Sequence, residues 1–180
     1  MTELKHKKST RLLWVDLEMT GLNPETDRIL ELAAIVTDFN FNELDKYEAV
    51  IFQPPQVLAG MNEWARSTHT ASGLLDRIKV APNEQQIINQ FVDFIKRNFG
   101  NEPAILAGNS IHQDRRFIRK WWPQVDALLH YRMLDVSSYK IIMQNKYGKE
   151  FVKQETHRAL DDIEESIAEL KFYLNNSNQS

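Results

Sequence analysis

Two acidic residues, Asp16 and Glu18, lie two positions apart near the end of an apolar segment that begins at Arg11. Side chains alternate between the two faces of a strand, so both carboxylates project from the same face, one pleat apart. Carboxylates this close raise each other's pKa unless a cation compensates, and a divalent ion with oxygen ligands is a common partner. The pair predicts a metal site or, as the simpler interpretation, two solvated acids at a strand end.

A third acid, Asp114, lies on the apolar stripe of a helix predicted over residues 110–121. The stripe residues recur at helical spacing and are Ile111, Ile118 and Trp121 or Trp122. An acid that faces a core requires neutralisation by a cation or by a neighbouring arginine. Asp114 is therefore another candidate metal ligand, and the alternatives are a helix-capping or an ion-paired acid.

The last predicted helix, residues 158–174, carries a fourth acid beside its apolar stripe. The stripe is formed by Leu160, Ile163, Ile167, Leu170 and Leu174. At 100° per residue, Asp162 lies closer to this stripe than Asp161, so Asp162 is the better ligand and Asp161 the capping or solvated acid. His157 precedes the helix and is expected to project from the loop that leads into it. Although a lone histidine is more often an ordinary surface or core residue, one with a pKa near neutrality can accept a proton.

The four acids and the histidine are more informative together than separately. Four carboxylates can hold two divalent ions, one to activate water and one to stabilise a departing oxygen. Magnesium or manganese is the natural choice for oxygen ligands. A phosphodiester is the substrate that requires such a site, so the set predicts a metal-dependent hydrolase that acts on nucleic acid.

The composition is that of an ordinary globular protein. The chain has 180 residues and a formal net charge of −3, which suits one buried core and argues against a large duplex-binding surface, although not against a short nucleic-acid ligand. No apolar run is long enough to span a membrane. The chain contains no cysteine, which excludes thiolate catalysis and thiolate-bound zinc. With no apolar signal segment at the N-terminus, we expect a cytoplasmic protein.

The pattern of apolar residues and turn formers predicts an α/β fold. The predicted strands cover residues 11–19, 29–39, 43–52, 104–107 and 132–136, and the second and third form an antiparallel hairpin. The predicted helices cover residues 63–67, 84–99, 110–121, 137–146 and 158–174, with Asn62 capping the first and Thr70 or Ser72 capping another. This order favours a mixed central sheet flanked by helices. We expect a flexible basic tail over residues 1–10, a single domain over residues 11–174 and a disordered polar tail over residues 175–180.

These residues resemble the DEDDh exonucleases, which have the ribonuclease H-like fold, in their four acids and one histidine. The longer matching motifs are those of the oligoribonuclease branch of that family. They are Trp14-Val15-Asp16-Leu17-Glu18-Met19-Thr20-Gly21-Leu22, Gly108-Asn109-Ser110, Gln113-Asp114-Arg115-Arg116-Phe117, His130-Tyr131-Arg132, Leu134-Asp135-Val136-Ser137 and His157-Arg158-Ala159-Leu160-Asp161-Asp162-Ile163. The resemblance extends from Arg11 to about Tyr173, which is nearly the whole chain.

The resemblance implies a homodimeric 3′-to-5′ exoribonuclease that cleaves short single-stranded RNA, down to dinucleotides, into nucleoside 5′-monophosphates at the final step of RNA degradation. It implies two Mg²⁺ or Mn²⁺ ions per site, with the ligands Asp16, Glu18, Asp114 and Asp162. His157 would be the general base. Tyr131 would be a second catalytic residue and would reach the active site of the partner protomer.

The resemblance also implies how the substrate is held. Leu22 would be a wedge between two bases, with Trp64 beside it in the base pocket. The residues expected to bind the 5′ phosphate are His69, Ser110, Arg132 and Ser137. Because these residues would bind the 5′ end, a substrate longer than the site would collide with them. The four residues would therefore also select substrates by length.

Simpler alternatives exist for several of these assignments. Leu22 and Trp64 could be core residues, His69 could be exposed, and Tyr131 with Arg132 could be a surface pair flanking an edge strand. The exposed-looking aromatic residues Trp121, Trp122 and Tyr131 are compatible with a homodimer. For the whole chain, the alternatives are another DEDDh enzyme, such as a DNA-proofreading or tRNA-trimming exonuclease, and a noncatalytic binding module. All four acids and the histidine are present, which argues against the last.

Overall fold

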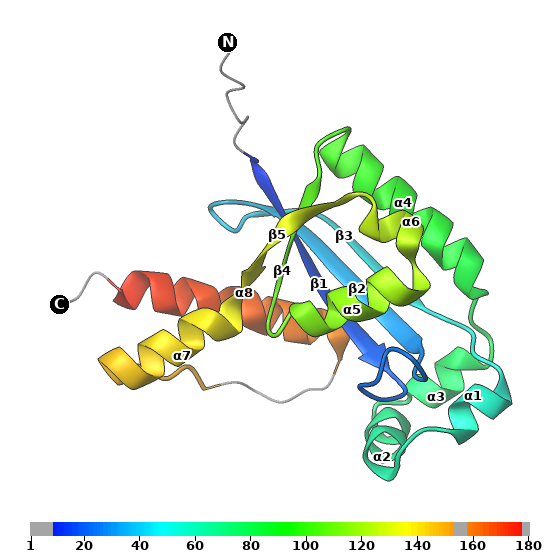
Figure 1. The fold of residues 1–180 in the computed structure, drawn as a ribbon. Coiled ribbons are helices and arrows are strands. Elements are labelled where there is room, and N and C mark those ends of the chain that lie inside the picture. The colour runs from blue at the N-terminus through cyan, green and yellow to red at the C-terminus, as the bar shows by residue number, and fades with distance from the viewer. Residues whose placement is uncertain (1–8, 153–157, 178–180) are drawn as a thin grey trace.

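The computed structural model describes residues 9–152 and 158–177, in which five strands form one mixed sheet in the order β3-β2-β1-β4-β5 (Figure 1). The strands are β1 (Arg11–Met19), β2 (Ile29–Asp38), β3 (Glu43–Val50), β4 (Ala104–Gly108) and β5 (Leu129–Asp135). β1 pairs antiparallel with β2 and parallel with β4, and β4 pairs parallel with β5. The predicted α/β class with a mixed sheet is therefore confirmed, and β1 is its central strand.

Helices cover both faces of the sheet (Figure 1). One face is covered by α4 (Glu84–Phe99), α5 (His112–Trp121) and α6 (Pro123–Asp126), and the other by α7 (Val136–Tyr147) and α8 (Ala159–Asn176). Three short helices lie near the end of β1, namely α1 (Pro55–Ala59), α2 (Glu63–Ala71) and α3 (Leu74–Ile78). None of the helices in the described part of the chain is both long and apolar enough to cross a membrane.

The alternation of side chains along β1 decides which face receives the acids. The residues that pack against α4 and α5 are Leu13, Val15 and Leu17. Leu12 and Trp14 face α7 and α8 instead, and the Trp14 Nε1–H donates a hydrogen bond to the Thr37 hydroxyl at 3.0 Å. Asp16 and Glu18 continue this second series, so the alternation directs both carboxylates to the α7–α8 face of the sheet.

A third, smaller cluster packs beyond the end of β1. Its buried residues are Leu30, Met61, Ala65, Leu74 and Ile78. The Asn62 side chain caps α2 by accepting a hydrogen bond from the Ala65 N–H at 2.8 Å. The small cluster and this cap together hold α2 against the start of β2.

Several predicted boundaries are wrong for identifiable reasons. α2 continues to Ala71, so Thr70 lies inside it and Ser72 ends it, and α3 follows Gly73, whose φ of 73° suits glycine. The short helices α1 and α6 were not predicted; each has a proline in its first turn and only five or four residues. β5 begins at Leu129 rather than at residue 132, and α8 continues to Asn176, two residues into the predicted polar tail.

Candidate functional site

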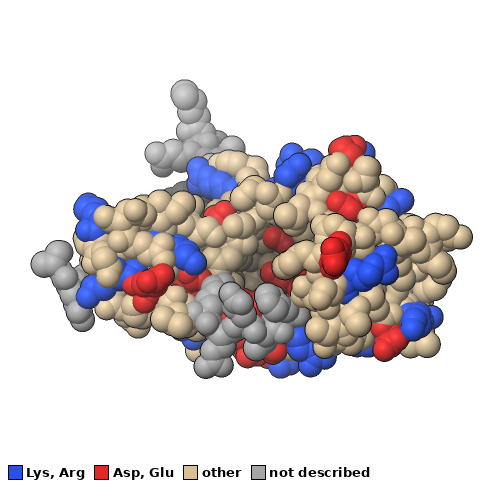
Figure 2. Space-filling model, turned by 90° about the horizontal axis from the view of Figure 1, so that it is seen from below, with Lys and Arg blue, Asp and Glu red and all other residues tan. Residues whose placement is uncertain are grey.

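Three carboxylates meet beside the end of β1. Asp16 and Glu18 project from the strand and Asp162 from the first turn of α8, and each offers an oxygen such that these atoms all lie within 4.8 Å of one another. All three residues are half-buried, and Asp161 is outside this group. Figure 2, viewed from the side to which β1 runs, shows acidic side chains at the bottom of a hollow in the middle of the face. The group is of the kind that can hold a metal ion.

Asp114 reaches β1 from the opposite face of the sheet. Its side chain is on α5, it is only 6% exposed, and its Oδ1 accepts a hydrogen bond from the Leu17 N–H at 3.1 Å. β4 pairs with β1 only at Leu13 and Trp14, so the edge of β1 beyond Trp14 is open to α5. Asp114 thus lies next to the strand that carries the other acids. It is held there because its carboxylate accepts from the Leu17 N–H, a backbone donor that β4 does not pair.

Gly108 permits the close approach of β4 and α5 to β1. A Cβ at this position would lie 3.0 Å from the Val15 carbonyl oxygen and 3.1 Å from Cδ1 of Ile111. Both distances are shorter than ordinary van der Waals contacts, and the first of them is to rigid backbone. A side chain at position 108 would therefore push the start of α5, and with it Asp114, away from β1.

Burial and neighbouring negative charges raise the pKa values of two acids of this site, Glu18 and Asp114. Burial, together with the neighbouring charges of Asp162, Glu31 and Asp114, raises the pKa of Glu18 to about 8. Burial also raises the pKa of Asp114 to about 7, with a contribution from the charge of Asp135. A divalent cation would remove both causes by supplying positive charge and oxygen coordination. The donor atoms and the charge of the site therefore fit a hard divalent cation.

We expect the stability of the metal-free protein to fall as pH rises from 6.5 to 8.5. In this range the folded state retains protons on Glu18 and Asp114 that the unfolded chain has already released, so each rise in pH favours unfolding. The loss should be on the order of 2 kcal/mol, at about 1.4 kcal/mol per unit of pKa shift and after allowance for solvent screening. Urea unfolding at the two pH values in the presence of EDTA measures it.

Magnesium should reverse this trend, because a carboxylate must lose its proton to bind a metal. The gain in the free energy of unfolding on adding Mg²⁺ should therefore be larger at pH 8.5 than at pH 6.5. The substitution Glu18→Gln is the control, since it should remove most of the fall in stability measured in EDTA. Equal stabilities of the metal-free protein at the two pH values would contradict the raised pKa values.

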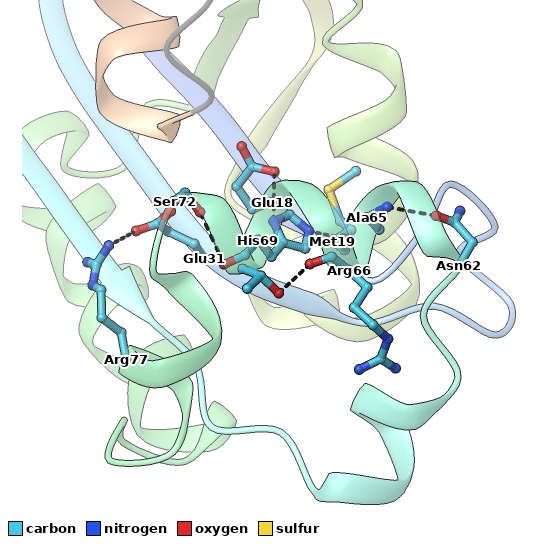
Figure 3. Close-up of polar contacts among 10 residues, drawn as sticks. Glu18, Met19, Glu31, Asn62, Ala65, Arg66, His69, Ser72 and Arg77 are labelled. Atoms are coloured by element: carbon cyan, nitrogen blue, oxygen red, sulfur yellow. Dashed lines mark hydrogen bonds and ion pairs between the residues drawn. The ribbon is translucent and has the colours of Figure 1, made fainter.

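His69 is buried beside the acidic group (Figure 3). It is 2% exposed, its Nε2–H donates to the Met19 carbonyl oxygen at 2.9 Å, and its Nδ1 lies 3.9 Å from Oε2 of Glu18. Burial lowers the pKa of His69, so the imidazole is neutral at pH 7, with its proton on Nε2. The interpretation that His69 is simply exposed is therefore wrong.

A second buried acid, Glu31, lies directly opposite Glu18 in the β1–β2 pairing. Burial raises its pKa, and the Arg77 guanidinium opposes that shift. Arg77 lies 2.7 Å from Glu31 (Figure 3). It also lies 3.0 Å from Glu48, so it bridges β2 and β3. The sequence shows an acid inside an apolar strand at this position, but its cationic partner on a separate helix could not be predicted.

The two serines of the predicted phosphate group lie together where β4 and β5 end. The Ser110 N–H donates to Oδ1 of Asp135 and to Oγ of Ser137, each at 3.0 Å, and the two hydroxyl oxygens are 3.2 Å apart. Asp135 also accepts from the Ser137 N–H and so caps α7. Ser110 has a φ of 49°, a left-handed conformation unusual for a residue other than glycine. The parallel pairing of β4 with β5 accounts for the meeting of these residues.

The remaining predicted substrate residues lie on the surface. Leu22 is 71% and Trp64 67% exposed, so the interpretation of both as core residues is wrong. Leu22 also lines a cavity of about 580 Å³. The residues lining that cavity are Thr20, Gly21, Leu22, Asn23, Asp27, Gly60, Asn62 and Arg116.

Tyr131 and Arg132 are exposed on β5, with the Arg132 guanidinium 5.2 Å from the centre of the Tyr131 ring. Trp122, expected to be exposed, is fully buried, and Trp121 is half-buried beneath the Arg28 guanidinium. His157 lies outside the described residues. Within the predicted phosphate set, Ser110 and Ser137 contact each other, whereas the described side-chain contacts of His69 are with Met19 and Glu18.

The chain is similar in sequence to a family of nucleases. Residues 13–170 match the RNase_T family, described as exonuclease. The chain is 47% identical over 172 residues to an oligoribonuclease of Francisella tularensis subsp. tularensis, covering 93% of this chain and 96% of the relative. An oligoribonuclease of Vibrio cholerae is 47% identical over 167 residues, covering 90% and 92%. The region matched by the family model therefore contains all of the acids described above.

Solved structures of exonuclease I share the fold. One, from Methylocaldum szegediense, superposes with a TM-score of 0.73 at 17% identity over 95% of this chain. Another, from E. coli in complex with a dA16 oligonucleotide, superposes with a TM-score of 0.69 at 17% identity over 93% of this chain. The present chain covers 42% and 41% of those two chains, so it corresponds to less than half of each. At this identity the comparison supports the ribonuclease H-like exonuclease fold.

Proposed function

Since the chain belongs to the oligoribonuclease family of exonucleases, and is thus a hydrolase that cleaves phosphodiester bonds of oligonucleotides from the 3′ end, we propose that its substrates are short single-stranded RNAs down to dinucleotides. The products would be nucleoside 5′-monophosphates, which places the enzyme at the final step of RNA degradation. The observation that carries this proposal is the convergence of Asp16, Glu18 and Asp162 beside the end of β1, with Asp114 hydrogen-bonded to the same strand. We also propose a cytoplasmic location, in keeping with the absence of cysteine.

The acidic group is the proposed site of two Mg²⁺ or Mn²⁺ ions. Its four acids supply oxygen donors only, which suits these ions better than a thiophilic metal. When bound, the ions would neutralise the acids, lower the pKa of water and offset negative charge on the phosphate and the leaving oxygen. The raised pKa values of Glu18 and Asp114 support the proposal. They arise from burial and from neighbouring negative charges, and bound cations would offset both effects.

His157 is the proposed general base. A water molecule attacks the phosphorus of the last phosphodiester, and the imidazole accepts the proton that the water loses. The bond from phosphorus to the 3′ oxygen of the preceding nucleotide then breaks, and a nucleoside 5′-monophosphate leaves. His157 is five residues before Asp162 and two before the start of α8, so it is close in the chain to a proposed metal ligand.

Leu22 and Trp64 are the proposed contacts to the bases. Both are large apolar side chains that are mostly exposed, an arrangement that costs solvation free energy unless a ligand covers them. Stacking on an aromatic ring contributes about 1 to 3 kcal/mol per base and tolerates every base. An enzyme that degrades RNA fragments of any sequence requires this tolerance.

Ser110, Ser137 and Arg132 are the proposed contacts to the 5′ phosphate. The two adjacent hydroxyls of the serines and the exposed guanidinium support this proposal, since hydroxyls and cations are the donors that phosphate prefers. Binding the 5′ end of a substrate whose 3′ end is at the acids would exclude longer chains. His69 stays in this set as a prediction only, because its described contacts are with Met19 and Glu18.

A homodimer is the proposed assembly. β5 is at one edge of the sheet, and an exposed edge strand readily pairs with another chain. Large apolar residues are exposed on β5 and α7, namely Tyr131, Met133, Ile141 and Ile142. Covering this surface with a second copy would bury them and would bring Tyr131 toward the partner's active site. Sedimentation of the protein alone would distinguish a dimer from a monomer.

The test of the proposed function compares substrates of different length. With Mg²⁺ present, kcat/KM should be highest for a 5′-phosphorylated dinucleotide and should fall for single-stranded RNA and DNA of about twenty nucleotides. A preference for the long DNA would instead support an exonuclease of the proofreading type. Absence of hydrolysis with either Mg²⁺ or Mn²⁺ would support a noncatalytic binding module.

The cap of α2 offers a further prediction. Replacing Asn62 with alanine removes the acceptor for the Ala65 N–H and should lower the free energy of unfolding by about 1 kcal/mol. Because α2 carries Trp64, we also expect a raised KM for dinucleotides. Asn83→Ala is the matched control, since Asn83 makes the same kind of cap on a different helix, α4, through the Gln86 N–H. It should cost similar stability and leave KM unchanged, and equal KM values for the two variants would contradict a role of α2 in binding.

A further inference from the structure

The side chain of Asn109 joins α8 to the two serines of the proposed phosphate site. Its Nδ2 donates hydrogen bonds to Oγ of Ser166 and to Oε2 of Glu169, both at 2.9 Å, and its Oδ1 accepts from the Ser137 hydroxyl at 3.2 Å. Both oxygens of Glu169 accept hydrogen bonds, so the amide nitrogen of Asn109 faces α8 and its oxygen faces Ser137. Both amide hydrogens and one acceptor position of the amide oxygen are thereby used.

The α8 end of this network is rigidly held. Glu169 is fully buried, and its Oε1 accepts a hydrogen bond from the Tyr173 hydroxyl at 2.8 Å. A buried carboxylate is costly unless it is hydrogen-bonded, and bonds to an ionised group are stronger than bonds between neutral groups. The Ser166 hydroxyl, which accepts from Asn109, donates to the carbonyl oxygen of Asp162 at 2.8 Å. The network therefore extends to the backbone of a proposed metal ligand.

The other end of the network determines the geometry of Ser110. The hydroxyl hydrogen of Ser137 is committed to Asn109, so the Ser137 oxygen is oriented to accept from the Ser110 N–H at 3.0 Å. That bond and the one to Asp135 compensate for the left-handed backbone of Ser110. Because the Ser137 hydrogen is already used, the Ser110 hydroxyl is the donor in the 3.2 Å bond between the two serine oxygens, and of the two hydroxyls it is the one that can turn to donate to a ligand.

We propose that Asn109 and Glu169 are positioning residues for recognition of the 5′ phosphate. They orient Ser137 and, through it, Ser110, and they tie both serines to the helix that carries Asp162. This inference rests on the proposed function, because it assumes that the serines bind a terminal phosphate. The network then sets the separation between the 5′-phosphate site and the acids, which is the quantity on which selection for dinucleotides depends.

The test uses one dinucleotide with and without its 5′ phosphate, in the presence of Mg²⁺. For the full-length variant Asn109→Ala, kcat/KM should fall about tenfold for the phosphorylated dinucleotide, mainly through KM, and should be unchanged for the 5′-hydroxyl form. A merely structural role would lower both values together. The conservative variant Glu169→Gln should keep the wild-type ratio of kcat/KM for the phosphorylated dinucleotide to kcat/KM for the 5′-hydroxyl form. Its amide oxygen can accept from Asn109 while its nitrogen donates to the Tyr173 oxygen.

Two further variants keep the test decisive. Glu169→Met has a similar length and removes the acceptor, so it should lower the ratio as Asn109→Ala does, and it replaces that variant if Asn109→Ala does not fold. Asn98→Ala, which loses a bond to Asp45 on β3, is the control and should leave the ratio unchanged. A wild-type ratio retained by both Asn109→Ala and Glu169→Met would overturn the inference. If the wild-type enzyme itself does not prefer the phosphorylated dinucleotide, the proposed function fails instead.

Discussion

Replacing Asp162 with asparagine is expected to lower kcat/KM for a dinucleotide by about a thousandfold, whereas Asp161→Asn should leave it nearly unchanged. The two residues are adjacent on the first turn of α8, so the substitutions disturb the helix equally, but only Asp162 is among the three acids whose oxygens converge. An asparagine keeps the shape and loses the charge that holds a cation. Losing cation stabilisation of the transition state costs several kcal/mol, which corresponds to this factor.

Two measurements on Asp162→Asn separate loss of metal from loss of fold. Because the charge of Asp162 contributes to the raised pKa of Glu18, the variant should show a smaller fall in the stability of the metal-free protein between pH 6.5 and 8.5. Addition of Mg²⁺ should stabilise the variant less than it stabilises the wild-type protein. Equal activity of the Asp161→Asn and Asp162→Asn variants would exclude Asp162 from the metal site.

Replacing His157 with alanine is expected to lower kcat by about 10²- to 10⁴-fold at saturating metal, the range that a positioned general base contributes. The imidazole is proposed to act on the attacking water and not on the metal, so the stabilisation of the fold by Mg²⁺ should persist. Asp162→Asn should lose both properties. The pair of variants therefore distinguishes a base from a ligand.

The pH dependence of turnover gives an independent measure of this role. In the wild-type enzyme, kcat should fall at low pH as the base becomes protonated, and the His157→Ala variant should lack that decrease. Added imidazole should restore part of the lost turnover by taking the place of the missing side chain. Near-normal turnover of the variant, or loss of its stabilisation by Mg²⁺, would contradict the assignment.

Much of the fold could be predicted because its signals are local. β1 and α4 have apolar patterns with the periods of a strand and a helix, and both were predicted with the observed boundaries. α1 and α6 have five and four residues and are too short to show the helical period of apolar residues. The sequence left open whether Trp121 or Trp122 lies on the apolar stripe, because the two residues are adjacent and of the same type, and the tertiary contacts of Trp122 with Phe91 and Glu84 distinguish them.

The site could be predicted in part, because some of its signals are also local in the sequence. The preference for Asp162 over Asp161 came from helical angles, and the structure places Asp162 with the strand acids. The burial of His69 was not predictable, since it depends on α2 folding back onto the end of β1. Glu169 showed only a weak signal, an acid near the apolar stripe of the last helix, and its partner Asn109 is 60 residues away in the chain.

The separateness of the small cluster around α2 has a consequence for how the enzyme would lose activity. Five buried residues hold this segment, and they belong to neither of the clusters that pack on the two faces of the sheet. A unit with so little buried apolar area opens at a lower free energy than the whole molecule unfolds. On mild heating, Trp64 should therefore leave its place while the sheet and its acids remain intact, and substrate affinity would decline before the native circular dichroism does.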